Sequence, residues 1–464
     1  MRRLSAALSV FALAACTLGP NYRPPAPSSL QVPDAWHQRG ADGQPADLTH
    51  WWEQFNDPLL TRLIGEASAS NLDLAVASSR LVQARESLVQ ARAGLVPTVG
   101  AGGSVGRTVG SGNDRTSVNL GADAAWEIDL FGRIRRGIEA AGADAESVWY
   151  DREALRVAIT AELATNYIQA RLTQERLALA REDLAIAEDN LQIAEWRRQA
   201  GLVSSLDTEQ ARAARAQAAA AIPGLEQGFA GATYRIAVLT GRAPGTLTAE
   251  LAEAKPVPRG PAEVAAGIPA DTLRQRPDVR SAERNLAAAT ARIGVAEAQL
   301  YPGLRLSGNI GTSAFSLGGL FSAITGSILA AVDQTLFDGG RLRSQLRSQQ
   351  AATEGALASY RQSVLTALED VENALAALTA ARARQTEFAT ALEAANNSAI
   401  LARIQYRSGL TSFDQLLAIE SRLVSAREGL ASSRADESLA LVQLYRALGG
   451  GWDPSLPPET RTTR

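Results

Sequence analysis

The chain has 464 residues with 46 basic and 49 acidic side chains, two histidines and one cysteine. One cysteine excludes a disulfide framework and a cysteine-based zinc site. His37 and His50 both lie in a Pro-, Gly- and Gln-rich N-terminal stretch, which argues against histidine-centred catalysis. A net charge of −3 lacks the basic excess of nucleic-acid-binding proteins. The sequence also lacks Walker A, Gly-x-Ser-x-Gly, HExxH and CxxC patterns, so we expect no enzyme, no metal, no cofactor and no nucleic acid partner.

The N-terminus has the features of an export signal. Two arginines precede an uncharged apolar run over residues 4–15, which is too short for a membrane helix of about 20 residues. The run ends in Leu13-Ala14-Ala15-Cys16, which resembles the lipobox of bacterial lipoproteins. We therefore expect removal of residues 1–15 and acylation of Cys16; an ordinary signal peptide with an incidental cysteine is the alternative. Thr17 follows in place of the Asp that favours inner-membrane retention, which points to the outer membrane.

Residues 16–50 are predicted to form a lipidated tether, because this stretch is rich in Pro, Gly and Gln. Acyl chains anchor a protein because each buried methylene group contributes about 0.8 kcal/mol. Outer membrane lipid is thus an expected partner.

The rest of the chain contains an internal repeat, which must be sought before any fold is assigned. Leu95-Val96-Pro97 recurs as Leu300-Tyr301-Pro302, and Gly201-Leu202 recurs as Gly409-Leu410, at a spacing of about 205 to 208 residues. The order of the matching segments is preserved. We predict a first repeat over 51–255, a second over 256–452, and a tail over 453–464.

Each repeat is predicted to contain a helix, a β-hairpin and a long helical hairpin. The first helices cover 57–93 and 270–299, and the helical hairpins cover 137–240 and 342–448. A helix of about 60 residues is roughly 90 Å long. Charges recur along these segments, which excludes a membrane-spanning helix. Pro223-Gly224 is expected to kink or break the second helix of the first hairpin.

The long helices carry a sustained seven-residue period. Leu177, Leu184 and Leu191 are spaced by seven, and a second series is Leu416, Leu423 and Leu430. Such a period imposes a supercoil, and apolar stripes at three heptad positions favour a closed ring of helices. A helix bundle with a filled core fits the heptads equally well.

Two Gly- and Ser-rich intervals are predicted to be β-hairpins over 97–125 and 302–332. The second is uncharged over 306–332, but its glycines disfavour a helix and Gly318-Gly319 suits a hairpin turn. Four strands cannot form an open sheet in a bilayer, because the edge groups would lack hydrogen bonds. Three chains would supply 12 strands and room for a lumen, which favours a homotrimer over a dimer. A soluble hairpin decoration is the alternative.

Several segments carry a resemblance to one family. Besides the lipobox, they are Trp51–Leu60, Trp126–Arg133, Arg276–Glu283 and Ala447–Trp452. From about residue 16 to 452 the chain resembles the TolC-type outer-membrane efflux channels, in particular the lipoprotein branch called the NodT family. The resemblance implies a mostly α fold with a small membrane β part. In that fold a long α-helical tunnel lies in the periplasm, and a transmembrane β-barrel is completed by trimerisation with four strands per chain.

The same resemblance implies a periplasmic gate at the turns of the helical hairpins. The matching residues are Asp207, Asp414, Arg198, Arg407 and Tyr406. The two carboxylates would form acidic rings in a trimer, and the other three side chains would bond the helices together. Capping of the returning helices by the aspartates is the alternative. Val203 and Thr411 stand where some relatives carry the aspartate, so a pore-facing role for either carboxylate is open. The turns themselves are implied to contact the adaptor through Gly201, Leu202, Gly409 and Leu410.

The resemblance thus implies a lipid-anchored channel in the outer membrane of a Gram-negative bacterium. It would act with a periplasmic adaptor and an inner-membrane pump, usually of the resistance-nodulation-division type, and would passively export drugs and toxic compounds. A duct for type I protein secretion and a non-channel lipidated coiled-coil scaffold are the alternatives.

Overall fold

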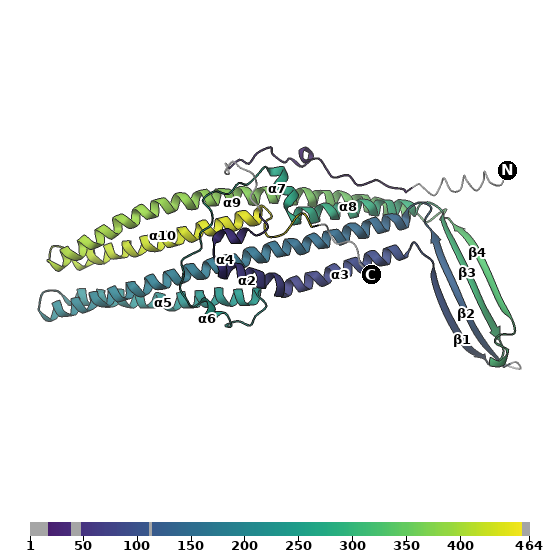
Figure 1. Ribbon diagram of the computed structural model, residues 1–464, viewed down its shortest axis with the longest axis horizontal. Helices are drawn as coiled ribbons and strands as arrows, with labels where there is room; N and C mark the ends of the chain where they lie inside the picture. The colour runs from purple at the N-terminus through teal and green to yellow at the C-terminus, as the bar shows by residue number, and fades with distance from the viewer. Residues whose placement is uncertain (1–16, 39–47, 111–113, 457–464) are drawn as a thin grey trace.

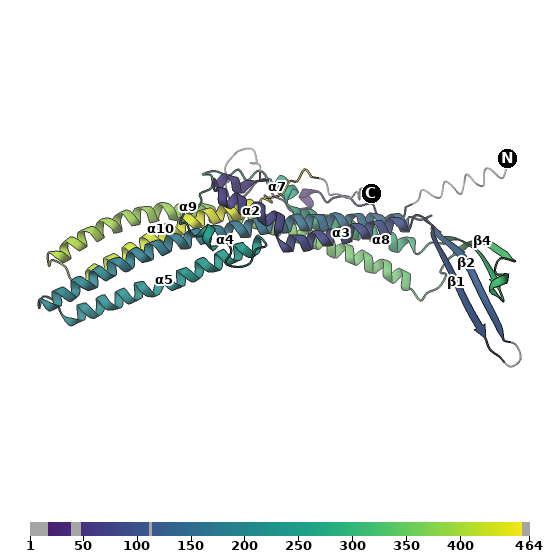
Figure 2. The same cartoon turned by 60° about the horizontal axis from the view of Figure 1, so that its bottom comes forward.

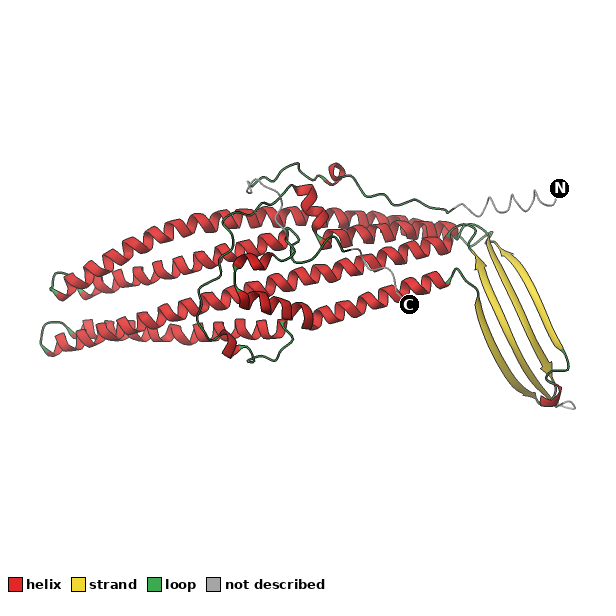
Figure 3. Cartoon of the chain, in the orientation of Figure 1, coloured by secondary structure: helices red, strands yellow, loops and turns green. Residues whose placement is uncertain are grey.

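The computed structural model describes residues 17–38, 48–110 and 114–456. The molecule is elongated, with two helical hairpins forming one end and a four-stranded sheet forming the other (Figures 1 and 3). The expected signal peptide over 1–15 and the expected lipid attachment site Cys16 lie outside the described residues.

The two halves of the chain repeat one order of elements. The first half contains α2 (Pro58–Ser70), α3 (Leu72–Ala93), β1 (Thr98–Thr108), β2 (Arg115–Ile128), α4 (Arg133–Gln199), α5 (Ser205–Leu239) and α6 (Thr248–Leu251). The second half contains α7 (Pro269–Gln275), α8 (Pro277–Ala298), β3 (Gly303–Ala314), β4 (Ile324–Asp333), α9 (Arg341–Arg407) and α10 (Phe413–Ala447). Short 3₁₀ helices are η1 (Pro27–Leu30), η2 (Trp51–Phe55) and η3 (Leu317–Gly319). Three pairs of corresponding helices have equal lengths: α4 and α9 have 67 residues, α5 and α10 have 35, and α3 and α8 have 22.

The first helix of each half is interrupted, which corrects the expectation of unbroken helices over 57–93 and 270–299. α2 and α3 are separated at Asn71, whose side chain accepts hydrogen bonds from two backbone N–H groups of the first turn of α3. α7 and α8 are separated at Arg276, because Pro277 begins α8 and has no N–H with which to continue a helix.

Of the kink or break expected at Pro223-Gly224, the break is absent: α5 runs without interruption through both residues. Proline removes one hydrogen bond from a helix interior. The carbonyl group that Pro223 leaves unbonded belongs to Ala219, which is partly exposed, so water can satisfy it.

The four strands form one antiparallel sheet in the order β1-β2-β3-β4. β2 pairs with β3, so the two predicted hairpins are joined into a continuous sheet that leaves β1 and β4 as its edges. The uncharged run over 306–332 contributes β3 and β4, as we predicted. Among the described residues, no helix combines the length and the apolar character needed to cross a membrane.

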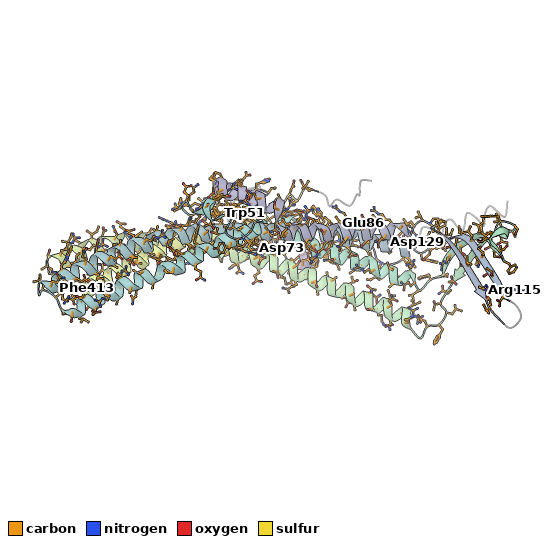
Figure 4. The ribbon with its side chains drawn as sticks, turned by 90° about the horizontal axis from the view of Figure 1, so that it is seen from below. Trp51, Asp73, Glu86, Arg115, Asp129 and Phe413 are labelled. Atoms are coloured by element: carbon orange, nitrogen blue, oxygen red, sulfur yellow. The ribbon has the colours of Figure 1, made fainter. Side chains whose placement is uncertain are left out.

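The largest apolar cluster lies in the middle of the molecule, where α2 packs against α4 and the last turns of α5 and α10. Trp51 is almost fully buried there and stacks on Tyr445, with ring centroids 5.1 Å apart. Figure 4 shows Trp51 at this level, between Phe413 at the end of the helical hairpins and Asp129 where the helices meet the strands. This cluster therefore anchors both helical hairpins at their base.

Residues 17–38, which we expected to form an extended tether, lie along the outside of the helices. Figures 1 and 2 show this segment beginning where α4 and α8 meet the strands and running toward the middle of the molecule. The Trp36 indole N–H donates to the Gly267 carbonyl group at 2.9 Å, and the backbone N–H of Gln38 donates to Glu372 at 3.0 Å. Specific hydrogen bonds thus hold this segment on the helices.

Candidate functional site

The turns between the long helices have the same conformation in both halves. Gly201 and Gly409 follow α4 and α9 with φ values of +70° and +72°, which favour glycine. The next residue in each turn donates its backbone N–H to a carbonyl group five residues earlier, at 2.9 Å for Leu202 and 2.8 Å for Leu410. These are Schellman motifs, which end a helix without unsatisfied carbonyl groups.

The apolar residue of each turn faces solvent. The Leu202 side chain is 70% exposed and the Leu410 side chain is 79% exposed. In a Schellman motif this side chain often packs on the preceding helix, and here it does not. Each turn therefore presents an exposed leucine, and contact of Gly201, Leu202, Gly409 and Leu410 with an adaptor stays a prediction.

The two aspartates lie in the first turns of the returning helices, but neither occupies the capping position. Ser204 and Ser412 precede α5 and α10, and the Ser412 hydroxyl accepts a hydrogen bond from the backbone N–H of Gln415 at 3.3 Å. Asp207 is half-buried, and its Oδ1 lies 3.5 Å from the Ser204 hydroxyl. Asp414 is exposed. Both carboxylates are near helix N-termini, where negative charge is favourable.

Tyr406 lies between the two helical hairpins, close to their turns. The guanidinium group that contacts it belongs to Arg197: its Nη1 donates to the Tyr406 carbonyl group at 3.3 Å and its Cζ lies 4.6 Å from the ring centroid. Arg198 and Arg407, which we expected to bond the helices together, are exposed. The Tyr406 ring packs on Phe413 at 5.5 Å, and within the described part of the chain its buried hydroxyl group has no hydrogen-bond partner.

A buried polar network joins the hairpins further from the turns. Glu420 of α10 accepts a hydrogen bond from Asn190 of α4 at 2.6 Å and an ion-paired hydrogen bond from Arg403 of α9 at 2.9 Å. Glu420 and Asn190 are 8% and 9% exposed. The network thus links the first half of the chain to both long helices of the second half.

Asp183 lies beside this network on α4. Burial raises the pKa of its carboxyl group, and the negative charges of Glu420 and Glu428 raise it further, whereas Arg427 opposes the shift. An acidic group is therefore held partly desolvated at the contact between the two halves.

These residues were not predicted from the sequence, although the heptads contain a signal for them. Glu420 is four residues after Leu416 and three before Leu423, so it interrupts an apolar stripe. Asn190 interrupts the stripe of Ile186 and Ile193 in the same way. A polar residue at an apolar heptad position indicates a specific inter-helix contact.

At the other end of the molecule the sheet has two different faces. Residues directly opposite in the ladder point to the same side, so the register assigns each side chain to a face. One face is mainly polar, with Leu329 an exception, and includes Ser104, Ser117, Asn119, Asp123, Ser307, Asn309, Ser313, Thr325 and Ser327. The other face is mainly apolar and includes Val99, Val105, Leu120, Trp126, Leu306, Ile310, Ile324, Ile328 and Val332.

Side chains on the polar face bond to one another across the strands. Asn119 donates to the Ser104 hydroxyl at 3.2 Å, and Ser327 donates to the Asn309 side chain. The large apolar side chains of the opposite face are exposed, for example Val99 at 75% and Ile328 at 85%. One polar and one exposed apolar face are typical of strands that separate water from lipid.

Aromatic side chains gather where the strands meet the helices. Phe131 stacks on Tyr301 with centroids 5.0 Å apart, and the Trp126 indole N–H donates to the Leu95 carbonyl group at 3.0 Å. Phe337, before α9, is 90% exposed. Such a girdle is found at the membrane–water interface of outer-membrane proteins. We refer to Trp126, Phe131, Tyr301 and Phe337 as the rim.

The model of one family, described as outer membrane efflux protein, matches residues 63–242 and 268–450, which together cover most of the chain. The chain belongs to this family. The match confirms the resemblance to outer-membrane efflux channels, a family of channels and not of enzymes.

Relatives of the efflux protein family align with nearly the whole chain. Nodulation protein T of Rhizobium leguminosarum bv. viciae is 32% identical over 97% of this chain and 94% of its own length. The pyoverdine export outer membrane protein OpmQ of Pseudomonas putida is 31% identical, with 93% of this chain and 95% of its own length covered.

Solved outer-membrane channels have the same fold as this efflux family member. The channel OprN superposes with a TM-score of 0.86 at 36% identity, covering 94% of this chain and all of its own. The open state of MtrE of Neisseria gonorrhoeae gives a TM-score of 0.84 at 26% identity, with 96% of this chain covered. CmeC of Campylobacter jejuni, at 21% identity and a TM-score of 0.86, shares the fold. These neighbours confirm the predicted fold class of a helical tunnel with a small membrane β part.

Proposed function

We propose that this protein is the outer-membrane channel of a tripartite efflux system and that three copies form the conduit. The observation that supports this most directly is the two-faced sheet with free edges. Within the part of the chain that the structure describes, β1 and β4 have no strand partner on their outer sides, and the apolar face carries large exposed side chains. Unpaired backbone groups are too costly in hydrocarbon for such a sheet to stay open.

Further copies of the chain would pair with the free edges of the sheet and so satisfy their backbone groups. In a trimer, β4 of each copy pairs with β1 of the next and produces 12 strands, whose polar faces line a lumen. Two copies would supply 8 strands, which leave little space for water. The long helices below the rim then continue the conduit as an α-helical tunnel in the periplasm.

The lipid anchor belongs to the same proposal. Cys16 is acylated after removal of residues 1–15, and its acyl chains enter the outer membrane beside the β-barrel. Incorporation of radioactive palmitate tests this: the wild type becomes labelled and Cys16→Ser does not. Equal labelling of the variant would contradict the lipobox.

The far end of the tunnel carries the gate and the adaptor contacts. Supporting observations are the exposed leucines of both turns and the first-turn carboxylates of Asp207 and Asp414. In this proposal Arg197, together with Arg198, Arg407 and Tyr406, holds the turns of the two hairpins close. A periplasmic adaptor binds Gly201, Leu202, Gly409 and Leu410, and an inner-membrane pump of the resistance-nodulation-division type supplies the energy.

The cargo proposed is a class of small molecules, such as drugs and toxic compounds, which cross the channel passively. The names of relatives such as the pyoverdine export protein of Pseudomonas putida support small-molecule export. In this proposal the protein is a conduit that uses no catalytic residues and no cofactor. Native mass spectrometry of the detergent-purified protein tests the assembly, because a mass of three chains is expected and a monomer would contradict the proposal.

A further inference from the structure

The segment Thr17–Tyr22, called here the anchor segment, is held in a site built from both halves of the chain. The Arg136 side chain is 3% exposed and donates hydrogen bonds to the Leu18 carbonyl group at 2.9 Å and to the Gly19 carbonyl group at 3.0 Å. It also donates to the Asn21 side chain at 2.8 Å. One buried guanidinium group thus satisfies three acceptors of the anchor segment.

Two glycines make room for the anchor segment. Gly294 lies inside α8, and a Cβ atom there would lie 2.8 Å from the Leu18 carbonyl oxygen and 2.8 Å from the Arg136 side chain. Gly132, before α4, has a φ of +82°, and its Cβ atom would lie 2.7 Å from the Thr17 methyl group. We refer to Gly132, Arg136 and Gly294 as the seat.

The seat is next to the rim. The backbone N–H of Leu18 donates to the carbonyl group of Phe131 at 3.2 Å, and Phe131 is itself a rim residue stacked on Tyr301. At the other end of the segment, the Tyr22 hydroxyl donates to Glu283 at 3.1 Å. The anchor segment is thus bound at both ends: Leu18 at the level where the strands begin, and Tyr22 further along α8 at Glu283.

We propose that the seat positions the lipid anchor: it holds the residue that follows Cys16 at the rim, so that the acyl chains enter the leaflet on the periplasmic side. Arg136 and Gly294 are then positioning residues. The lipid anchor both retains the channel in the membrane and sets the depth of the channel there. The inference rests on the proposed acylation of Cys16. A flexible tether would retain the protein but could not set its depth.

Gly294→Ala tests the seat, because the added methyl group overlaps the Leu18 carbonyl group. Gly355→Ala is the matched control, since Gly355 also lies inside a helix and a Cβ atom there would meet no atom of the described residues within 4 Å. Hydrogen exchange of the Leu18 amide should become faster by about tenfold or more in Gly294→Ala and Arg136→Gln, and should not change in the control. Unchanged exchange in both seat variants would overturn the proposal.

The depth of the channel is measured with a fluorescent label on Leu336→Cys, a position that is 93% exposed beside the rim. An acylated Cys16 leaves this residue as the only free thiol. In vesicles containing brominated lipids, Gly294→Ala should shift the quenching profile of the label, whereas Gly355→Ala should not. In a Cys16→Ser background the shift should vanish, because no lipid remains to be positioned.

The outcomes separate this inference from the proposed function. Faster exchange without a shift in quenching would overturn the positioning role, since the seat would then only hold the segment. Absence of palmitate labelling in the wild type would contradict the lipid anchor of the proposed function, and the positioning role with it, while the exchange result would stand. A shift in the quenching profile that persists in the Cys16→Ser background would also overturn the positioning role.

Discussion

Asn71 and Arg276 occupy corresponding positions in the two halves, at the interruption of the first helix of each half. Each side chain bonds this interruption, called here the joint, to the end of the returning helix. The Asn71 amide group donates to the carbonyl group of Leu239, the last residue of α5, at 2.9 Å. The Arg276 guanidinium group donates to the carbonyl group of Ala447, the last residue of α10, also at 2.9 Å. Each returning helix is therefore tied to the break in the first helix of its own half.

The joint at Asn71 gives a prediction for stability. Asn71→Ser keeps a capping oxygen for α3 but cannot reach Leu239, so it should cost about 1–2 kcal/mol for the buried hydrogen bond. Asn71→Ala also loses the cap and should cost about 1 kcal/mol more. Thermal unfolding followed by circular dichroism measures both. Equal unfolding temperatures for the two variants would contradict the dual role of this side chain.

Sequence patterns predicted the large elements but not these joints. Heptads predicted the long helices, because periodicity reports which face of an element is buried, and the Gly- and Ser-rich intervals with their turn signals predicted both β-hairpins. The apolar pattern continues through Asn71, and the interruption is explained by two roles of this side chain in the structure: it caps α3 and it bonds to Leu239. The helix continues through Pro223 because water can reach the carbonyl group that proline leaves unbonded, and the solvent exposure of a backbone group cannot be read from a single sequence.

The candidate site was predicted less completely than the fold. The resemblance named Tyr406 and the two turns, whereas the partner of Tyr406 is Arg197, one residue from the expected Arg198. On a helix, neighbouring residues point about 100° apart, so a shift of one residue decides which arginine faces the second hairpin. Contacts between hairpins depend on such rotations and are not visible in the sequence.

Removal of the charge on Glu420 should loosen the contact between the two hairpins. Glu420→Gln leaves the Arg403 guanidinium group without its carboxylate and weakens the bond to Asn190, at a cost of about 1–3 kcal/mol. We expect a lower unfolding temperature and a larger leak conductance. Glu428→Gln is the control, because Glu428 is exposed on the same helix. A leak that increases equally in both variants would argue against a role for the buried network.

The pKa of Asp183 predicts a pH effect of defined sign. Burial and the nearby acidic groups raise the pKa of this carboxyl group in the folded protein. Between the unfolded and folded pKa values the folded state binds more protons, so stability falls as the pH rises through that window. Asp183→Asn should therefore raise the unfolding temperature at pH 7, with a gain that shrinks as the pH is lowered.

The control for this pH series is Asp189→Asn, which changes an exposed carboxylate on the same helix. Calorimetry from pH 4 to pH 8 compares the two variants with the wild type. A gain for Asp183→Asn that is independent of pH would show that ionisation of Asp183 does not affect stability.

Two substitutions of Tyr406 distinguish the packing of its ring from hydrogen bonding by its hydroxyl group at the proposed gate. Because this buried group has no partner among the described residues, Tyr406→Phe should be neutral or should stabilise the protein by up to about 1 kcal/mol. Tyr406→Ala removes the ring that contacts Arg197 and Phe413, and should raise the leak conductance. If Tyr406→Phe leaks as much as Tyr406→Ala, the hydroxyl group makes a bond across the gate between protomers.

The double variant Asp207→Ala with Asp414→Ala tests the proposed acidic rings. Loss of charge at a helix N-terminus should cost about 0.3–1 kcal/mol per residue. If the carboxylates also face the pore, the leak conductance should rise or its dependence on cations should change. A change in unfolding temperature alone would assign both residues to helix stabilisation.

The conductance of the purified protein in a planar lipid bilayer tests the central claim most directly. We expect discrete steps of a water-filled pore from the wild type, small at rest because of the proposed gate at the turns, and larger steps from Glu420→Gln. Absence of any conductance from correctly folded, membrane-inserted protein would contradict the proposed channel.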